Sequence, residues 1–113
     1  MNRLLIRLEH KGRVIHEIGS WEIHDPVSIG RSRRCGWRTA KEDPIISSSH
    51  AELCRKGRTV WIQDLDSKNG VFYKGDRIKK HALKDGDRGG IGNHTLIAEK
   101  EKNELMHKRL TIQ

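Results

Sequence analysis

Hydrophobic and polar residues alternate at the start of the chain. Between residues 3 and 9, leucine or isoleucine occupies every second position, and charged residues fill most of the positions between. A period of two places successive side chains on opposite faces of a strand, so this segment predicts a β-strand with one buried face. The spacing resumes at Val14, His16 and Ile18 after a turn at residues 11–13, and we therefore expect an antiparallel hairpin.

Turn signals then divide the rest of the chain into short apolar runs. Residues 51–54 and 59–62 are two such runs joined by a basic turn, which predicts a second hairpin. The pair Asn69-Gly70, just before residues 71–73, is typical of a two-residue hairpin turn. Because turns are frequent and helical periodicity is almost absent, the pattern predicts an all-β sandwich or barrel.

The longest irregular stretch is residues 31–45, which are polar and basic and follow a short apolar segment at residues 27–29. Irregular segments of more than about twelve residues are uncommon in compact domains and are usually functional or disordered. We therefore expect this loop to lie beside a functional site.

A length of 113 residues suits one modest core and is too short for two independent domains. We assign residues 1–100 to that domain. Residues 99–106 have a composition that favours helix. We therefore expect residues 101–113 to form a C-terminal tail, either a short helix or a linker.

The charge balance favours an anionic partner, since 23 Lys and Arg outnumber 15 Asp and Glu and give a formal net charge of +8. Charge alone leaves open nucleic acid, an acidic membrane surface, a phosphorylated protein, and a basic surface that serves only solubility. Aromatic residues make up 4% of the chain, too few for a row of base-stacking platforms, so nucleic acid is disfavoured.

Neither membrane insertion nor metal binding is expected from the sequence. The first apolar run has three residues, and no window approaches transmembrane length. Cys35 and Cys54 match no metal-ligand spacing, and the seven histidines show no His-x-x-x-His or similar spacing. We expect two free thiols in a reducing, cytoplasmic compartment, with no metal and no other cofactor.

Short motifs in a fixed order carry the strongest functional signal. The three motifs are Gly30-Arg31, Ser47-Ser48-Ser49-His50 and Asn69-Gly70. Their order and spacing resemble the forkhead-associated (FHA) domain family, whose pattern is a Gly-Arg pair, then Ser-x-x-His, then Asn-Gly. Residues 75–78 and 83–87, followed by Gly92, also resemble the last third of that family, so the resemblance covers roughly residues 3–100.

The resemblance implies an FHA-type antiparallel β-sandwich of about eleven short strands, whose loops at one end bind phosphothreonine. It assigns Arg31 and Ser47 to the phosphate and Asn69 to the main chain of the peptide. An arginine fork forms charge-assisted hydrogen bonds to phosphate oxygens, and an amide offers both donor and acceptor to an extended peptide. Ser48 could add a further donor, while Lys68 could contact the phosphate or stay in solvent.

The resemblance also implies supporting residues, while the departures from it and the charge of the long loop indicate specificity residues. Gly30 would let the loops approach closely, Gly70 would support the turn after Asn69, and His50 would brace the loops by hydrogen bonds without any catalytic role. The irregular stretch is slightly longer than is usual in the family, and its candidate specificity residues are Arg33, Arg34, Trp37 and Arg38. The arginines favour acidic residues near the phosphothreonine. Trp37 is either a buried anchor, which we favour, or an exposed reader of peptide side chains.

The predicted function is a phosphothreonine-dependent protein-interaction module within a larger signalling or scaffold protein. The alternatives are a phosphate-independent docking module and, disfavoured, a basic nucleic-acid-binding domain. No Gly-rich phosphate loop precedes a helix, and no nucleophile is paired with a base, since Ser49 and His50 as strand neighbours would point to opposite faces. We therefore expect no enzymatic activity.

Overall fold

The N-terminal alternation forms the predicted hairpin. In the computed structural model, which describes residues 3–102, β1 (Leu4–His10) pairs antiparallel with β2 (Arg13–Gly19). Lys11 and Gly12 between them have φ of 53° and 76°. Two successive positive φ values give a turn whose twist matches that of the strands, which explains why the hairpin closes here.

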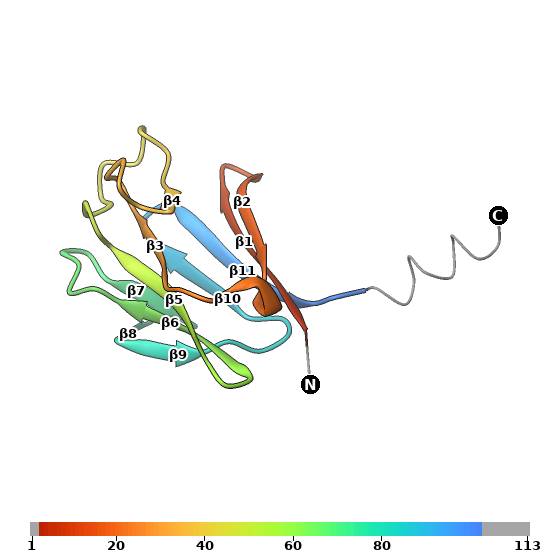
Figure 1. Ribbon diagram of the computed structural model, residues 1–113. Helices are drawn as coiled ribbons and strands as arrows, with labels where there is room; N and C mark the ends of the chain where they lie inside the picture. Colours follow the sequence, from red (N-terminus) through yellow and green to blue (C-terminus); the bar gives the residue numbers. More distant parts are fainter. Residues whose placement is uncertain (1–2, 103–113) are drawn as a thin grey trace.

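The described residues form eleven strands in two stacked sheets (Figure 1), so the predicted all-β sandwich is confirmed. After the hairpin and a single 3-10 turn, η1 (Ser20–Glu22), the remaining strands are β3 (Val27–Gly30), β4 (Trp37–Arg38), β5 (Ala51–Lys56), β6 (Thr59–Asp64), β7 (Val71–Tyr73), β8 (Asp76–Ile78), β9 (Lys80–Ala82), β10 (Arg88–Ile91) and β11 (His94–Lys100).

One sheet has six strands in the order β2-β1-β11-β10-β7-β8, and the other has five in the order β4-β3-β5-β6-β9. Among the described strands, all pairs are antiparallel except β3 and β4. The predicted hairpin of β5 and β6 is present, with Gly57 at φ 63° in its turn. No helix long and apolar enough to span a membrane occurs in residues 3–102.

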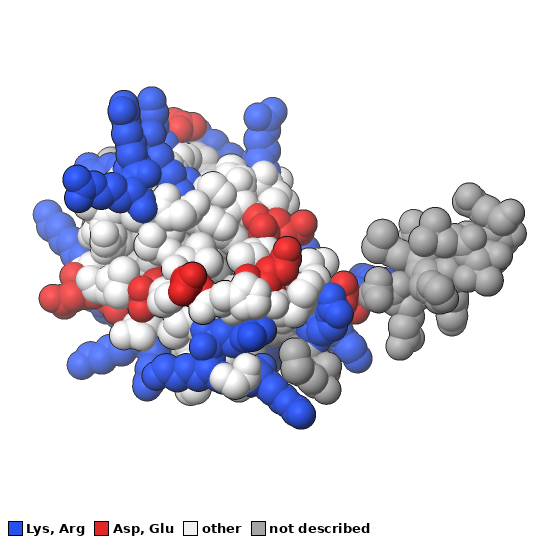
Figure 2. All heavy atoms as spheres, viewed as in Figure 1, with Lys and Arg blue, Asp and Glu red and all other residues white. Residues whose placement is uncertain are grey.

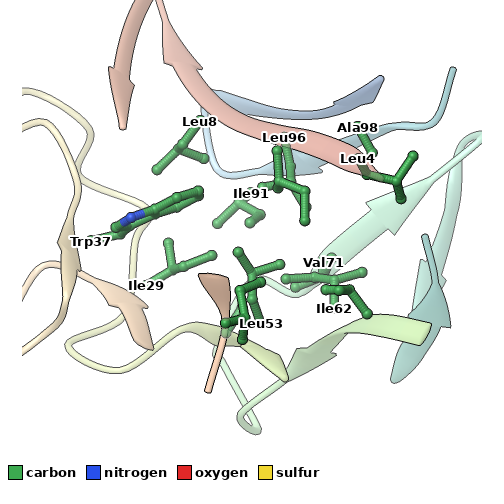
Figure 3. Close-up of a cluster of buried hydrophobic side chains, with 14 of the residues drawn as sticks. Leu4, Leu8, Ile29, Trp37, Leu53, Ile62, Val71, Ile91, Leu96 and Ala98 are labelled. Atoms are coloured by element: carbon green, nitrogen blue, oxygen red, sulfur yellow. The ribbon is translucent and has the colours of Figure 1, made fainter. Parts of the chain in front are cut away.

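The core lies between the two sheets and is built from the inward-facing residues of the alternating strands. Leu8 and Leu96 from one sheet meet Ile29 and Leu53 from the other, and all four are at most 2% exposed. Figure 3 shows these side chains pointing toward one another, with Trp37 at one edge of the cluster. Burial of such aliphatic side chains contributes about 1.5–3 kcal/mol each and holds the sheets together.

The alternation in β2 is interrupted by a β-bulge. Leu8 pairs with His16 while Glu9 pairs with Val14, which leaves Ile15 without a partner in the ladder. Val14 therefore faces outward and is 51% exposed, and Ile15 packs against the core instead. The prediction of one shared face for the alternating residues of β2 was wrong at Val14, because an extra residue in one strand shifts all side chains beyond it.

The predicted hairpin turn at Asn69-Gly70 was also wrong. β6 pairs with β5 and β9, whereas β7 pairs with β10 and β8, so residues 65–70 cross from one sheet to the other. Gly70 has a φ of 88°, but Asn69 does not adopt the left-handed conformation expected of it. The two-residue hairpin lies instead between β7 and β8, where Lys74 and Gly75 both have positive φ.

The segment with helix-favouring composition begins inside the last strand. Glu99 and Lys100 belong to β11 and pair with Leu5 and Leu4 of β1. Pairing with a central strand overrides the helical preference of their composition. The remainder of the predicted tail, from residue 103 onward, lies outside the described residues.

Candidate functional site

Three loops meet at one end of the sandwich, at the upper left in Figure 1. They are the segment after β3, the segment before β5 and the crossing between β6 and β7. The backbone N–H of Arg31 donates to Ser47 O at 3.1 Å, and the N–H of Lys68 donates to Ser47 Oγ at 3.1 Å. The side-chain amide of Asn69 donates to Ile45 O at 2.9 Å. Residues far apart in the sequence thus gather at one place.

Gly30 permits the closest approach between these loops. A Cβ at this position would lie 2.2 Å from the backbone oxygen of Ser48, far inside any real contact, so a side chain would force the loops apart. The guanidinium of the neighbouring Arg31 is exposed, and its Nη2 lies 3.5 Å from Ser48 Oγ. Its cationic fork is therefore open to an anion from solvent.

The hydroxyl of Ser47 is oriented by the crossing loop. Because its oxygen accepts the N–H of Lys68, its own proton is free to be donated to a ligand. Ser48 and Lys68 are exposed beside it. Asn69 is exposed as well, and its bond to Ile45 O uses one amide hydrogen and leaves the amide oxygen free to accept.

His50 connects two of the loops from beneath. Its Nδ1 accepts the N–H of Ser47 at 3.0 Å, so Nε2 carries the proton and donates to Gly70 O at 2.8 Å. The residue is fully buried and neutral in this tautomer. Both ring nitrogens are used by the backbone, so the contacts are those of a brace and leave His50 no free group for chemistry.

Two supporting residues of the crossing loop were missed in the sequence. The buried Ser67 donates its hydroxyl to Asp64 Oδ1 and accepts the N–H of Gly70 at 2.9 Å. Arg77 Nη2 donates to Ser67 O at 2.9 Å from β8. The Asp-x-x-Ser spacing is typical of side chains that bond a local turn and could have indicated the first contact, but no local signal indicates Arg77.

The long loop divides into an exposed part and a buried part. Arg33 and Arg34 are exposed, whereas Trp37 is 6% exposed and stacks on His16 with ring centroids 5.4 Å apart. Trp37 therefore has the burial of the anchor that we favoured. Arg38 is half-buried and donates from Nε to Arg31 O at 3.1 Å, which ties the end of β4 to the site.

Positive charge is concentrated around the three loops, where Figure 2 shows Lys and Arg side chains gathered over this end of the molecule. The exposed basic residues of the loops are Arg31, Arg33, Arg34, Lys41 and Lys68. Like charges close together raise the local potential and attract an anion. The site can therefore bind an anionic group, and a peptide main chain could reach the free amide oxygen beside it.

A second polar cluster lies beneath the long loop and was not anticipated from the sequence. The side chains of Asp43 and His94 are fully buried, and His94 Nδ1 donates to Asp43 Oδ2 at 2.8 Å. Burial alone would raise the pKa of Asp43, but hydrogen bonds from Asn93, His94 and Ile45 outweigh it and lower that pKa. Burial lowers the pKa of His94, and Asp43 offsets part of this effect.

His10 stacks on His94 with centroids 4.6 Å apart, and potential ligand atoms of His10, Asp43 and His94 lie within 4.8 Å of one another. Such a group could hold a metal ion. Here, however, His94 Nε2 accepts the N–H of Ala40 at 3.0 Å while Nδ1 bonds Asp43, so both nitrogens of His94 are engaged. The hydrogen bonds fit a structural pair better than a metal site.

Comparison with protein families gives a match to the FHA domain over residues 27–92. The chain belongs to the FHA domain family. The matched segment contains all three motifs and all three loops of the site. Comparison with curated proteins finds no match.

Solved FHA structures share the fold of this FHA domain. One, described with phosphothreonine-dependent FHA interactions, has 23% identity and a TM-score of 0.70, covering 88% of this chain and 97% of its own. The FHA domain of a Chlamydia trachomatis protein has 22% identity and a TM-score of 0.71, covering 88% and 98%. Mycobacterium tuberculosis EmbR, in complex with a low affinity phosphopeptide, has 24% identity and a TM-score of 0.69, covering 88% and 24%.

Proposed function

We propose that this FHA domain is a phosphothreonine-dependent protein-interaction module and not an enzyme. The observation that carries the proposal is the convergence of an exposed guanidinium, a hydroxyl with a free proton and an amide with a free oxygen, from Arg31, Ser47 and Asn69. The phosphopeptide bound to EmbR and the phosphothreonine dependence described for another FHA structure support it.

In this proposal the phosphate lies between Arg31 and Ser47. Charge-assisted hydrogen bonds of this kind contribute about 1.5–3 kcal/mol each. Ser48 and Lys68 are close enough to add a donor and a charge, since Ser48 Oγ lies within 3.5 Å of the guanidinium and the backbone of Lys68 contacts Ser47. Gly30, His50 and Gly70 keep the loops at this separation.

Asn69 clamps the main chain of the bound peptide. Its free oxygen would accept a peptide N–H, while Ile45 fixes the rest of the amide. Arg33 and Arg34 extend from the neighbouring loop and favour acidic residues near the phosphothreonine, with Arg38 held closer to the site by its bond to Arg31. The partner is thus a threonine-phosphorylated protein, and we place the domain in a cytoplasmic signalling or scaffold protein.

An oriented phosphothreonine peptide library tests phosphate dependence and flanking preference together. We expect the selected peptide to bind, its unphosphorylated form to bind at least about 100-fold more weakly, and Arg31→Ala to abolish binding without unfolding the domain. Arg58→Ala is the matched control, because it removes an equal charge from the exposed turn between β5 and β6. Equal binding of both peptide forms would instead support a phosphate-independent docking module.

Nucleic acid binding is tested in the same preparation. A gel shift that survives Arg31→Ala and weakens steeply with salt would favour the basic nucleic-acid-binding alternative. We expect no such shift.

A further inference from the structure

Asp43 anchors the long loop to the turn between β10 and β11. The residue is 1% exposed. Its carboxylate accepts the backbone N–H of Asn93 at 2.6 Å, the side-chain amide of Asn93 at 3.1 Å and Nδ1–H of His94 at 2.8 Å. Gly92 leaves the space for this contact, because a Cβ there would lie 2.7 Å from Asp43 Oδ2.

His94 holds the same loop at a second point. Its Nε2 accepts the N–H of Ala40 at 3.0 Å, and the N–H of Asp43 donates to Ala40 O at 3.2 Å. The acceptor role of Nε2 requires the proton to be on Nδ1, which is the form that donates to Asp43. The segment from residue 40 to residue 43 is therefore a closed turn fixed on β11 from both ends.

The fixed turn leads directly to the amide of Asn69. Asp43 Oδ1 accepts the N–H of Ile45 at 3.3 Å, and Ile45 O accepts the side-chain amide of Asn69 at 2.9 Å. The next residue, Ile46, is 2% exposed and closes the segment against the core. Two consecutive hydrogen bonds thus connect a buried carboxylate to the exposed Asn69.

We propose that Asp43, held by His94, is a positioning residue that orients Asn69 toward the main chain of a bound phosphopeptide. The inference rests on the proposed function, in which Asn69 is the clamp. It does not extend to the phosphate contacts, because Arg31 bonds the backbone of Ser47 and His50 holds Ser47 in turn. Loss of Asp43 should therefore separate recognition of the peptide from recognition of the phosphate.

Asp43→Asn is the decisive variant, because it keeps the shape and replaces one of two oxygens that both accept hydrogen bonds by an NH2 donor. In one orientation the NH2 group would oppose Nδ1–H of His94, which cannot change its role while Nε2 accepts from Ala40. In the other it would oppose the N–H of Ile45, so two donors face each other in either case. We expect about tenfold weaker binding of the library-selected phosphothreonine peptide, with O-phospho-L-threonine binding, measured by NMR titration, changed by less than about twofold. In an Asn69→Ala background, Asp43→Asn should cause no further loss.

Asp87→Asn is the matched control, since Asp87 is a buried carboxylate with three hydrogen-bond donors that contact no residue of the site. Asp87→Asn should change neither the affinity for the selected peptide nor the affinity for O-phospho-L-threonine. Unchanged peptide affinity in Asp43→Asn, an equal loss for both probes, or a full additional loss in the Asn69→Ala background would each overturn the proposal.

A failure of the proposed function has a different signature. If the wild-type domain binds neither probe, the phosphopeptide role is wrong, and the side-chain amide resonance of Asn69 in the free protein still reports on positioning. A shift of that resonance in Asp43→Asn and not in Asp87→Asn would support the orienting contact. An unshifted resonance would refute it.

Discussion

Two aspartate–histidine pairs with a buried carboxylate occur in residues 3–102, and they serve different parts of the fold. Asp87 bonds the Tyr73 hydroxyl at 3.0 Å, His81 Nε2 at 2.9 Å and the N–H of Lys84 at 2.8 Å. Tyr73 lies on β7 of the six-stranded sheet and His81 on β9 of the five-stranded sheet. This pair joins two regular sheets, whereas the pair of Asp43 and His94 joins an irregular loop to a hairpin turn.

The difference lies in what else holds each partner. Strands carry a ladder of backbone hydrogen bonds that keeps their shape when one side-chain contact is lost. A loop has no such ladder, so its conformation depends on the few side chains that anchor it. The Asp87 pair therefore links strands that are also held by their own ladders, whereas the conformation of the long loop depends on the Asp43 pair.

The largest expected difference between the two pairs is in the free energy of unfolding after Asp43→Ala and Asp87→Ala. The side chains of Asp43 and His94 are both fully buried, so Asp43→Ala leaves the donors of Asn93 and His94 unpaired and should cost about 3–5 kcal/mol. His81 has a side chain that is 20% exposed, and water can replace part of the lost contact, so Asp87→Ala should cost about 1–3 kcal/mol. Urea unfolding measures both values.

The control is Asp25→Ala, which removes an exposed carboxylate of equal charge and should change stability by less than about 0.5 kcal/mol. An Asp87→Ala loss equal to or larger than that of Asp43→Ala would contradict the ranking.

The pH dependence of stability should show a smaller effect that also distinguishes the pairs. The pKa of His94 is lowered from 6.5, so as the pH falls below 6.5 the histidine is protonated in the unfolded chain before it is protonated in the folded domain. The contribution of His94 to the free energy of unfolding should be fully present above pH 6.5. It should fall as the pH drops toward the lower folded pKa, by at most about 1.4 kcal/mol per pH unit. Thermal unfolding across pH 7 to 5 measures this slope.

Both carboxylates act in a more acidic range. The pKa values of Asp43 and Asp87 are lowered from 3.8, so their contributions are present above 3.8 and are lost as the pH falls through the folded values. His94→Gln should therefore flatten the upper part of the profile, and Asp87→Asn should leave that part as in the wild type. An unchanged upper slope in His94→Gln would assign the effect to other groups.

The smallest expected effect is on phosphopeptide binding, and it distinguishes an exposed lysine beside the site from one beside Asp87. Lys68 borders the site, and Lys84 follows β9 beside Asp87. Lys68→Ala should weaken phosphopeptide binding about two- to fivefold at low salt, because an exposed charge contributes about 0.2–1 kcal/mol, while Lys84→Ala should leave it unchanged. Fluorescence polarisation at two salt concentrations measures both. Equal losses would mean that only the net charge of the domain matters.

Much of the fold could be predicted from local patterns. The alternation in β1 and the turn at Lys11 and Gly12 depend on neighbouring residues alone, and both were predicted correctly. The failures at Val14 and Asn69 have a common cause. A bulge and a crossing between sheets depend on which strand a segment pairs with, and the same turn chemistry fits either outcome.

The candidate site divides in the same way. The motifs containing Arg31, Ser47 and Asn69 are short runs of neighbouring residues and could be read directly, whereas Asp43 and His94 are 51 positions apart. No spacing rule connects them, and no local pattern of histidines indicates the cluster.

By itself, the sequence determined the strand periodicity, most of the turns, the basic loop and the three motifs, because each of these is written in residues that are close in the chain. The tertiary structure decided the sheet that each strand joined, the face that Val14 took and the anchoring of the long loop. Those outcomes depend on burial and on hydrogen bonds between distant residues, whose free energy exists only once the two sheets have packed.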